Sequence, residues 1–220
     1  MFNGFFPQTH EFLLSLAFNN ERSWFTAHKE EFEKYVKEPF GEFGRELLGR
    51  VEDAYPEKQW RLRVTRIYRD ARRLFGRGPY KDHLWLTVSE DGMDDVAAPA
   101  FWFAIEPVSY GYGMGIYSPT AAHKERYREM IDANPFELER LAESFGRQDV
   151  FTLSGDSYAK KKGSYAEPLS TWYNLKSFSL ECRKDYGPDA YSPAIVDEVA
   201  RGYGELMPYY EYFRKSSLEP

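Results

Sequence analysis

Residues 61–81 hold the side chains whose types and spacing point most directly to chemistry. The segment reads RLRVTRIYRDARRLFGRGPYK, with seven arginines, one lysine and a single acid, Asp70. It carries a formal charge of +7, whereas the other residues carry −13 from 21 bases and 34 acids. An arginine side chain donates paired hydrogen bonds to a carboxylate or a phosphate and stays charged at any working pH. The pattern therefore predicts either a site for an anion or ion pairs with the chain's own carboxylates.

The candidate ligand-binding residues lie where the strand expected at the start of this segment gives way to a loop. Side chains alternate along a strand, so Arg61 and Arg63 share one face and Arg66 takes the other. Asp70 is expected to pin one guanidinium, because an unpartnered arginine cluster repels itself. The glycines in the turn at 76–79 let the backbone approach a ligand closely. The predicted ligand-binding set is Arg66, Arg69, Asp70, Arg72, Arg77, Tyr80 and Lys81.

Three hypotheses for this basic segment stay open. In the first, it forms a pocket for a small anionic ligand bearing phosphate or carboxylate, and the arginines stabilise negative charge if a reaction occurs there. In the second, it belongs to an interaction module and binds an acidic protein partner or a nucleic acid. In the third, the arginines are internal struts paired with buried acids. The sequence does not decide whether the protein is an enzyme, identifies no catalytic residue and leaves the oligomeric state open.

The bulk composition restricts the class of protein. Of the 220 residues, 42% are hydrophobic and 18% aromatic, which is enough for a substantial core. The single cysteine, Cys182, excludes an internal disulfide and agrees with a reducing compartment. The sequence shows neither a signal peptide nor a membrane-spanning apolar run, so a soluble, cytoplasmic protein without a membrane partner is expected. The pI near 5.4 argues against nucleic acid as a partner of the whole surface.

The sequence predicts no cofactor and no metal site. Its four histidines are far apart, and none pairs with another at the spacing of helical metal ligands. The run GYGMG lacks the spacing and the strand-turn-helix context of a dinucleotide-binding loop, and a phosphate-loop motif is absent. Only His83, which follows the basic segment, is a candidate proton carrier.

Two further patterns have more than one interpretation. Gly111, Gly113 and Gly115 fall on one face of an expected strand, where they should make room for aromatic rings of a packed helix; a close backbone or a flat ligand is the alternative. Tyr158 and the lysines at 160–162 form either a second basic wall or a solvated loop.

Hydrophobic periodicity predicts residues 1–220 to be a single α+β domain. Spacings of three and four indicate three helices in the first 55 residues, with Thr9 capping the first and Pro39 in the first turn of the third. Period-two alternation indicates strands at 61–66, 84–89, 101–105 and 110–116. We therefore expect an antiparallel sheet of about four or more strands, packed by N-terminal and C-terminal helices.

The second half of the chain returns to helical spacing. The segment at 150–165 is expected to be a loop, and Pro208 is expected to kink or end the last helix. The remaining predicted elements are helices at 120–131, 135–145, 169–173 and 193–206 and a strand at 176–182.

Several motifs resemble the signature of an uncharacterised conserved family, domain of unknown function 2461. They are RIYRDARR followed by GPYKDH, the opening FLLSLAFNNERSWFTAHKEEFEKYVKEPF, GYGMGIYSP, the region of Asp156, Tyr158 and Lys160, and LKSF. The resemblance covers nearly the whole chain and implies no established activity. The chain departs from the family pattern R-F-S-K-D-K-T-P-Y-K between Arg72 and Lys81, where Arg77 keeps one cation. The recurring polar positions that the resemblance implies are Asn20, Trp24, Lys29, Arg66, Arg69, Asp70, Arg72, Pro79, Tyr80 and Lys81.

Overall fold

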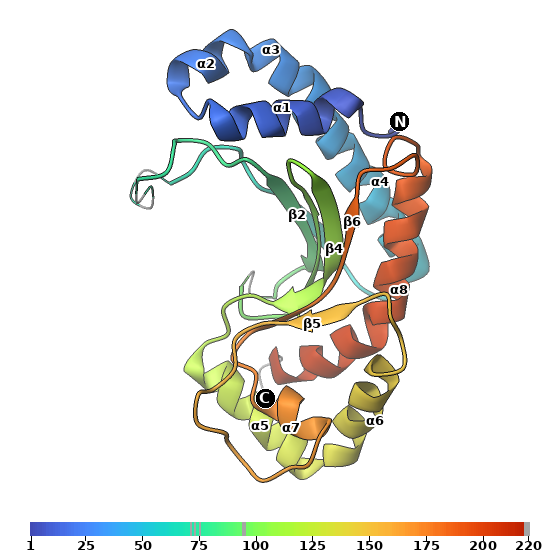
Figure 1. The fold of residues 1–220 in the computed structure, drawn as a ribbon. Helices are drawn as coiled ribbons and strands as arrows, with labels where there is room; N and C mark the ends of the chain where they lie inside the picture. The colour runs from blue at the N-terminus through green and yellow to red at the C-terminus, as the bar shows by residue number, and fades with distance from the viewer. Residues whose placement is uncertain (71, 73, 75, 94–95, 218–220) are drawn as a thin grey trace. The chain divides into compact units, whose positions relative to one another are not determined.

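The computed structural model describes residues 1–70, 72, 74, 76–93 and 96–217. Within these residues, six strands form one antiparallel sheet in the order β1-β2-β3-β4-β6-β5 (Figure 1). The strands are β1 (Trp60–Val64), β2 (Leu84–Glu90), β3 (Ala100–Ile105), β4 (Ser109–Ile116), β5 (Thr152–Ser154) and β6 (Phe178–Asp185). Together with helices at both ends of the chain, this sheet confirms the predicted α+β class and the antiparallel sheet of four or more strands.

Contacts between Cα atoms divide the chain into two compact units. The first comprises 1–88, 102–112 and 183–201, and the second comprises 89–101, 113–182 and 202–220. The prediction of a single domain over 1–220 stays a prediction. In the described part of the chain, no helix combines the length and the apolar character needed to cross a membrane.

The first unit contains the N-terminal helices. They are α1 (Pro7–Phe18), α2 (Arg22–Ala27), α3 (Lys29–Phe32), a π-helical turn η1 (Glu33–Lys37) and α4 (Glu38–Ala54). Pro39 occupies the first turn of α4 as predicted, since its fixed φ suits that position. The predicted cap Thr9 lies instead inside α1, where its buried hydroxyl donates to the Tyr35 carbonyl at 2.6 Å.

Aromatic rings form the core of the first unit. Phe43 lies 4.2 Å from Phe103 of β3, between ring centroids, and Phe5 stacks on the same Phe103 ring at 5.9 Å. Phe2 and Phe40 are also fully buried. Large rings remove much apolar surface from water, so this cluster attaches α4 and the segment before α1 to the sheet.

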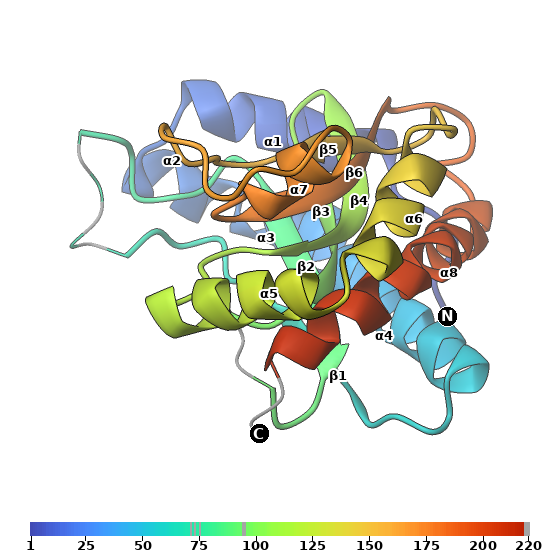
Figure 2. The same ribbon diagram turned by 90° about the horizontal axis from the view of Figure 1, so that it is seen from below.

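The second unit contains the C-terminal helices. They are α5 (Ala121–Ala133), α6 (Pro135–Phe145), α7 (Leu169–Tyr173), the later part of α8 (Ala194–Arg214) and the 3-10 turn η3 (Lys215–Ser217), with α5 and α6 adjacent in Figure 2. Thr120 caps α5, because its hydroxyl accepts from the His123 N–H. The helix α8 continues through Pro208, so of the two outcomes predicted at that proline, a kink or an end, the helix end does not occur.

Buried tyrosines dominate the core of the second unit. The ring of Phe101 stacks on Tyr203 at 4.5 Å and on Tyr210 at 4.9 Å. Tyr203, Tyr210 and Tyr212 are almost completely buried, and burial raises the pKa of each phenol. These phenols therefore stay protonated in the folded chain at pH values where an exposed tyrosine ionises.

The glycines of β4 accommodate a neighbouring strand. A Cβ added at Gly113 would lie 2.0 Å from the Leu180 carbonyl oxygen, and one at Gly115 would lie 2.2 Å from the Phe178 carbonyl oxygen. The prediction that aromatic rings fill this space is wrong at both positions, and the alternative of a close backbone is correct. The reason is that β6 passes β4 too closely for any side chain.

Candidate functional site

The predicted ligand-binding residues lie on one structure, the basic arm, which we define as residues 66–81 between β1 and β2. The arm extends beside α1 and α2 (Figure 1). Its two legs pair through the backbone, since the Arg69 N–H donates to the Pro79 carbonyl at 2.9 Å and the Lys81 N–H to the Ile67 carbonyl at 2.7 Å. A bridge between Tyr68 and Tyr80 continues this pairing. The segment predicted as a loop is therefore an antiparallel hairpin at its base. Ala71, Arg73 and Phe75 lie outside the described residues.

A side chain from the α1–α2 junction clasps the arm. The Asn20 side chain accepts from the Tyr80 N–H and donates to the Tyr80 carbonyl, each at 2.9 Å. A Cβ at Gly78 would lie 2.2 Å from the Asn20 carboxamide oxygen, so only glycine fits there. The Tyr80 ring stacks on Phe25 of α2 at 4.1 Å and is buried. Sequence reasoning missed this contact; the place of Asn20 among the recurring positions of the family resemblance was the available signal.

Arg69 supports the base of the arm. Only 16% of its side chain is exposed, and its Nε donates to the Tyr80 carbonyl at 2.7 Å. One terminal nitrogen of its guanidinium lies 3.4 Å from an Asp82 carboxylate oxygen, which also contacts His83 Nδ1 at 3.0 Å. Burial acts to raise the pKa of Asp82, but the hydrogen bond from His83 and the charge of Arg69 leave that pKa below its ordinary value. Asp82 was not among the predicted site residues, although its position directly after Lys81 was visible.

Two further cations lie beside Arg69. The Lys81 ammonium donates to the Arg66 carbonyl oxygen at 2.9 Å, while the Arg66 side chain is exposed. Burial, together with the charges of Arg66 and Arg69, lowers the pKa of Lys81. We call Arg66, Arg69 and Lys81 the basal cation group. These three like charges repel one another and form a local excess of positive charge.

The other predicted residues form separate contacts along the arm. Asp70 accepts two hydrogen bonds from the Arg72 guanidinium, at 3.1 and 2.8 Å, so Asp70 pins one guanidinium as predicted. This bond and the Asp70 charge raise the pKa of Arg72, whose side chain is 88% exposed. Arg77 is exposed, and its Nε and backbone N–H both donate to the Leu74 carbonyl. In the described part of the chain, no three His, Cys, Asp or Glu side chains gather to hold a metal ion.

Comparison with known proteins gives one result. A family model described as a conserved hypothetical protein (DUF2461) matches residues 8–212, which include all seven predicted ligand-binding residues. A search of the curated proteins gives no match.

Proposed function

The chain belongs to the DUF2461 family, whose description names no activity, and we propose from the geometry of the basic arm that this arm binds a small anionic group, a phosphate or a carboxylate. The binding groups in this proposal are the three members of the basal cation group. Asp70 and Asp82 orient arginines, and the buried ring of Tyr80 forms the wall beside them.

The observation that carries the proposal is the imbalance of charge at the base of the arm. Among the described residues, Asp82 is paired with Arg69, but no carboxylate lies within ion-pair distance of Arg66 or Lys81. Three cations, of which one is paired with an acid, leave net positive charge at the base of the hairpin. An anion would relieve this repulsion, and charge-assisted hydrogen bonds from arginine are among the strongest that proteins form. Such donors would also stabilise negative charge on a reacting group.

A second function is favoured by the exposure of the outer arm. Arg72 and Arg77 extend into solvent, and the Tyr68 ring is 49% exposed. Exposed cations and an exposed aromatic ring on the same arm suit an acidic protein surface or a single nucleic-acid strand. In this alternative the chain is an interaction module, and the outer arginines bind instead of the basal group.

Titration calorimetry of the full chain with inorganic phosphate, succinate and adenosine monophosphate tests the proposal. We expect at least one of them to bind, and Arg66→Gln and Lys81→Gln each to weaken binding by about tenfold or more, the usual effect of losing one charged hydrogen bond. Arg77→Gln is the matched control, with an effect below about twofold. Binding should weaken as the pH rises toward the lowered pKa of Lys81, starting below the ordinary value of 10.5, and Lys81→Arg should move this loss to higher pH.

The same variants distinguish the basal anion site from the interaction module. Absence of binding by every ligand, or equal binding by wild type and Lys81→Gln, would contradict the basal site. Salt-sensitive retention of polyglutamate or single-stranded DNA that is lost in Arg72→Gln and Arg77→Gln, but not in Arg66→Gln, would support the interaction module.

A further inference from the structure

The side-chain amine of Lys81 has no acidic partner. It donates to the Arg66 carbonyl oxygen at 2.9 Å, and among the described residues no carboxylate lies within ion-pair distance of it. The carboxylate of the next residue, Asp82, contacts Arg69 and His83 instead. A nearby carboxylate favours the charged ammonium form of a lysine, and Lys81 lacks that support.

The neighbours of this amine are cationic. Its hydrogen-bond acceptor is the backbone of Arg66, and the Arg69 Nε donates at 2.7 Å to the carbonyl of Tyr80, the residue before Lys81. Burial, together with the charges of Arg66 and Arg69, lowers the pKa of Lys81. Near neutral pH the neutral fraction of a lysine rises about tenfold for each pH unit by which its pKa falls. The Lys81 amine is therefore unprotonated more often than an ordinary lysine.

A neutral lysine amine is a nucleophile for carbonyl groups. A neighbouring cationic group is one of the means by which enzymes activate such an amine. The nitrogen adds to the carbonyl carbon, and the carbinolamine that forms loses one water, so that a C=N bond replaces the C=O bond. This condensation needs neither an oxidant nor a reductant. The hydrogen bond to the Arg66 carbonyl uses one N–H of the neutral amine and leaves its lone pair for the attack.

The two arginines of the basal cation group determine which carbonyl compounds suit this amine. Their forked guanidiniums bind a carboxylate through paired hydrogen bonds. We propose that the anion bound at the base of the arm is an α-keto acid, with its carboxylate on Arg66 and Arg69 and its carbonyl carbon condensed with Lys81 as a reversible imine. In such an acid the carbonyl carbon is bonded directly to the carboxylate, so binding by the cations that flank Lys81 brings that carbon to the amine. This inference rests on the proposed anion site and names the chemical class of its ligand.

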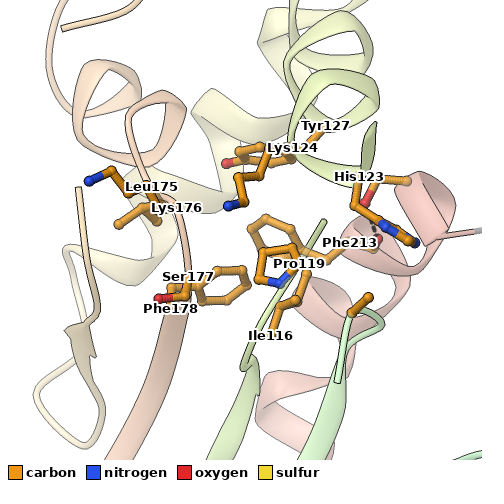
Figure 3. Close-up of a pocket in the computed structure, with 12 residues that line it drawn as sticks. Ile116, Pro119, His123, Lys124, Tyr127, Leu175, Lys176, Ser177, Phe178 and Phe213 are labelled. Carbon is orange, nitrogen blue, oxygen red and sulfur yellow. Dashed lines mark hydrogen bonds between the residues drawn. The ribbon is translucent and has the colours of Figure 1, made fainter. Parts of the chain in front are cut away.

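A lysine of the second compact unit provides a matched comparison. Lys124 extends from α5 beside a hollow whose wall includes the rings of Phe178 and Phe213 (Figure 3). Both rings are already buried and lie 4.3 Å apart between centroids, so they leave little apolar surface for a ligand. Lys124 is half-buried like Lys81, and within the described part of the chain no carboxylate lies within ion-pair distance of it. It belongs to the unit that does not contain the two basal arginines.

Reductive trapping of the imine tests the proposal. The full chain is incubated with pyruvate, sodium borohydride converts any imine to a stable secondary amine, and peptide mapping by mass spectrometry measures the adduct at each lysine. We expect the ratio of adduct at Lys81 to adduct at Lys124 to be about ten or more. Methyl pyruvate carries the same carbonyl without the negative charge, so with that reagent the ratio should fall about tenfold, the usual effect of losing a charged hydrogen bond.

Variants and a competitor identify the cause of the selectivity. Arg66→Gln should lower trapping of pyruvate at Lys81 by about tenfold. Arg140→Gln removes an exposed guanidinium of α6 and should change this trapping by less than about twofold. Succinate uses the same cations but has no keto group, so it should compete with pyruvate.

Three results would show that the inference is wrong: no pyruvate adduct at Lys81, equal reaction at Lys124, or the same ratio with methyl pyruvate. Binding of succinate that depends on Arg66, without any pyruvate adduct at Lys81, would overturn the imine and leave the proposed anion site standing. Absence of both would overturn the two proposals together.

Discussion

Arg69 differs from the other predicted ligand arginines because most of its side chain is buried where protein atoms engage its guanidinium. Its contacts with the Tyr80 carbonyl and Asp82 fix the base of the hairpin. A guanidinium that protein contacts already hold in place would present a preoriented donor to an anion, with less side-chain entropy left to lose on binding. The hypothesis of internal struts and the hypothesis of an anion site are therefore compatible at this residue.

Asn20 provides the clearest test at the level of one residue. Asn20→Ala leaves the Tyr80 N–H without its side-chain acceptor and removes one donor from the Tyr80 carbonyl. We expect the free energy of unfolding to fall by about 1–3 kcal/mol, the cost of an unsatisfied buried polar group. Urea denaturation followed by circular dichroism measures this change.

Asn19→Ala is the matched control for that experiment. The Asn19 side chain is exposed and bonds only to the Ser15 carbonyl of its own helix. Its loss should cost less than about 0.5 kcal/mol. Equal destabilisation by the two variants would show that the clasp on Tyr80 contributes nothing specific.

The sequence was informative about which residues gather on the arm but not about what holds them. Charge and turn residues within one short segment identified the seven candidate residues and predicted that Asp70 pins one guanidinium, without saying which one. The clasp could not be predicted, because Asn20 and Tyr80 lie 60 residues apart and their contact depends on how α2 meets the hairpin. Asp82 was passed over because an acid next to a lysine has no distinctive pattern.

At the level of elements, β4 and β6 show how a strand constrains its neighbour. The carbonyls of Leu180 and Phe178 occupy the positions where side chains of β4 would begin. The period-two alternation of side chains located β4, but it could not show that the backbone of β6 lies over the glycines. The three-residue strand β5 was missed for a related reason: its register, Thr152 opposite Glu181, is supplied by β6 and not by its own pattern.

A pair of glycine-to-alanine changes tests this constraint. Gly113→Ala places a methyl group 2.0 Å from the Leu180 carbonyl oxygen and should destabilise the protein by about 1–3 kcal/mol or more, as overpacking does. Gly49→Ala in α4 meets no atom within 4 Å and should stabilise it by about 0.5–1 kcal/mol. Thermal unfolding of both variants measures the difference. A melting temperature for Gly113→Ala at or above that of wild type would exclude the close approach of β6.

At the level of the whole molecule, an acidic chain gathers two local groups of cations. The formal net charge is −6, yet the basal cation group holds more positive than negative charge, and so does a second group, in which Arg128, Lys162 and Lys176 surround the ring of Tyr158. The sequence revealed the first group because its members lie within one short segment, 66–81. The second group draws Arg128, Lys162 and Lys176 from three separate segments, so only the fold brings it together.

The buried tyrosines predict how the whole molecule responds to alkali. Burial raises the pKa of Tyr127, Tyr203, Tyr210 and Tyr212, whereas the unfolded chain ionises its tyrosines near pH 10. The unfolded state therefore releases protons first, and stability should fall as the pH rises above about 10. Near-ultraviolet absorbance should show these phenols ionising abruptly, together with the loss of circular dichroism. Smooth ionisation of all 17 tyrosines in a folded chain would contradict this expectation.

The contact between Gly78 and Asn20 has a practical meaning for protein engineering. A hairpin grafted from a relative would pack here only if position 78 is glycine. A replaced α1–α2 junction would need a side-chain amide that reaches the Tyr80 backbone. Chimaeras of this protein should therefore exchange the two pieces as one cassette.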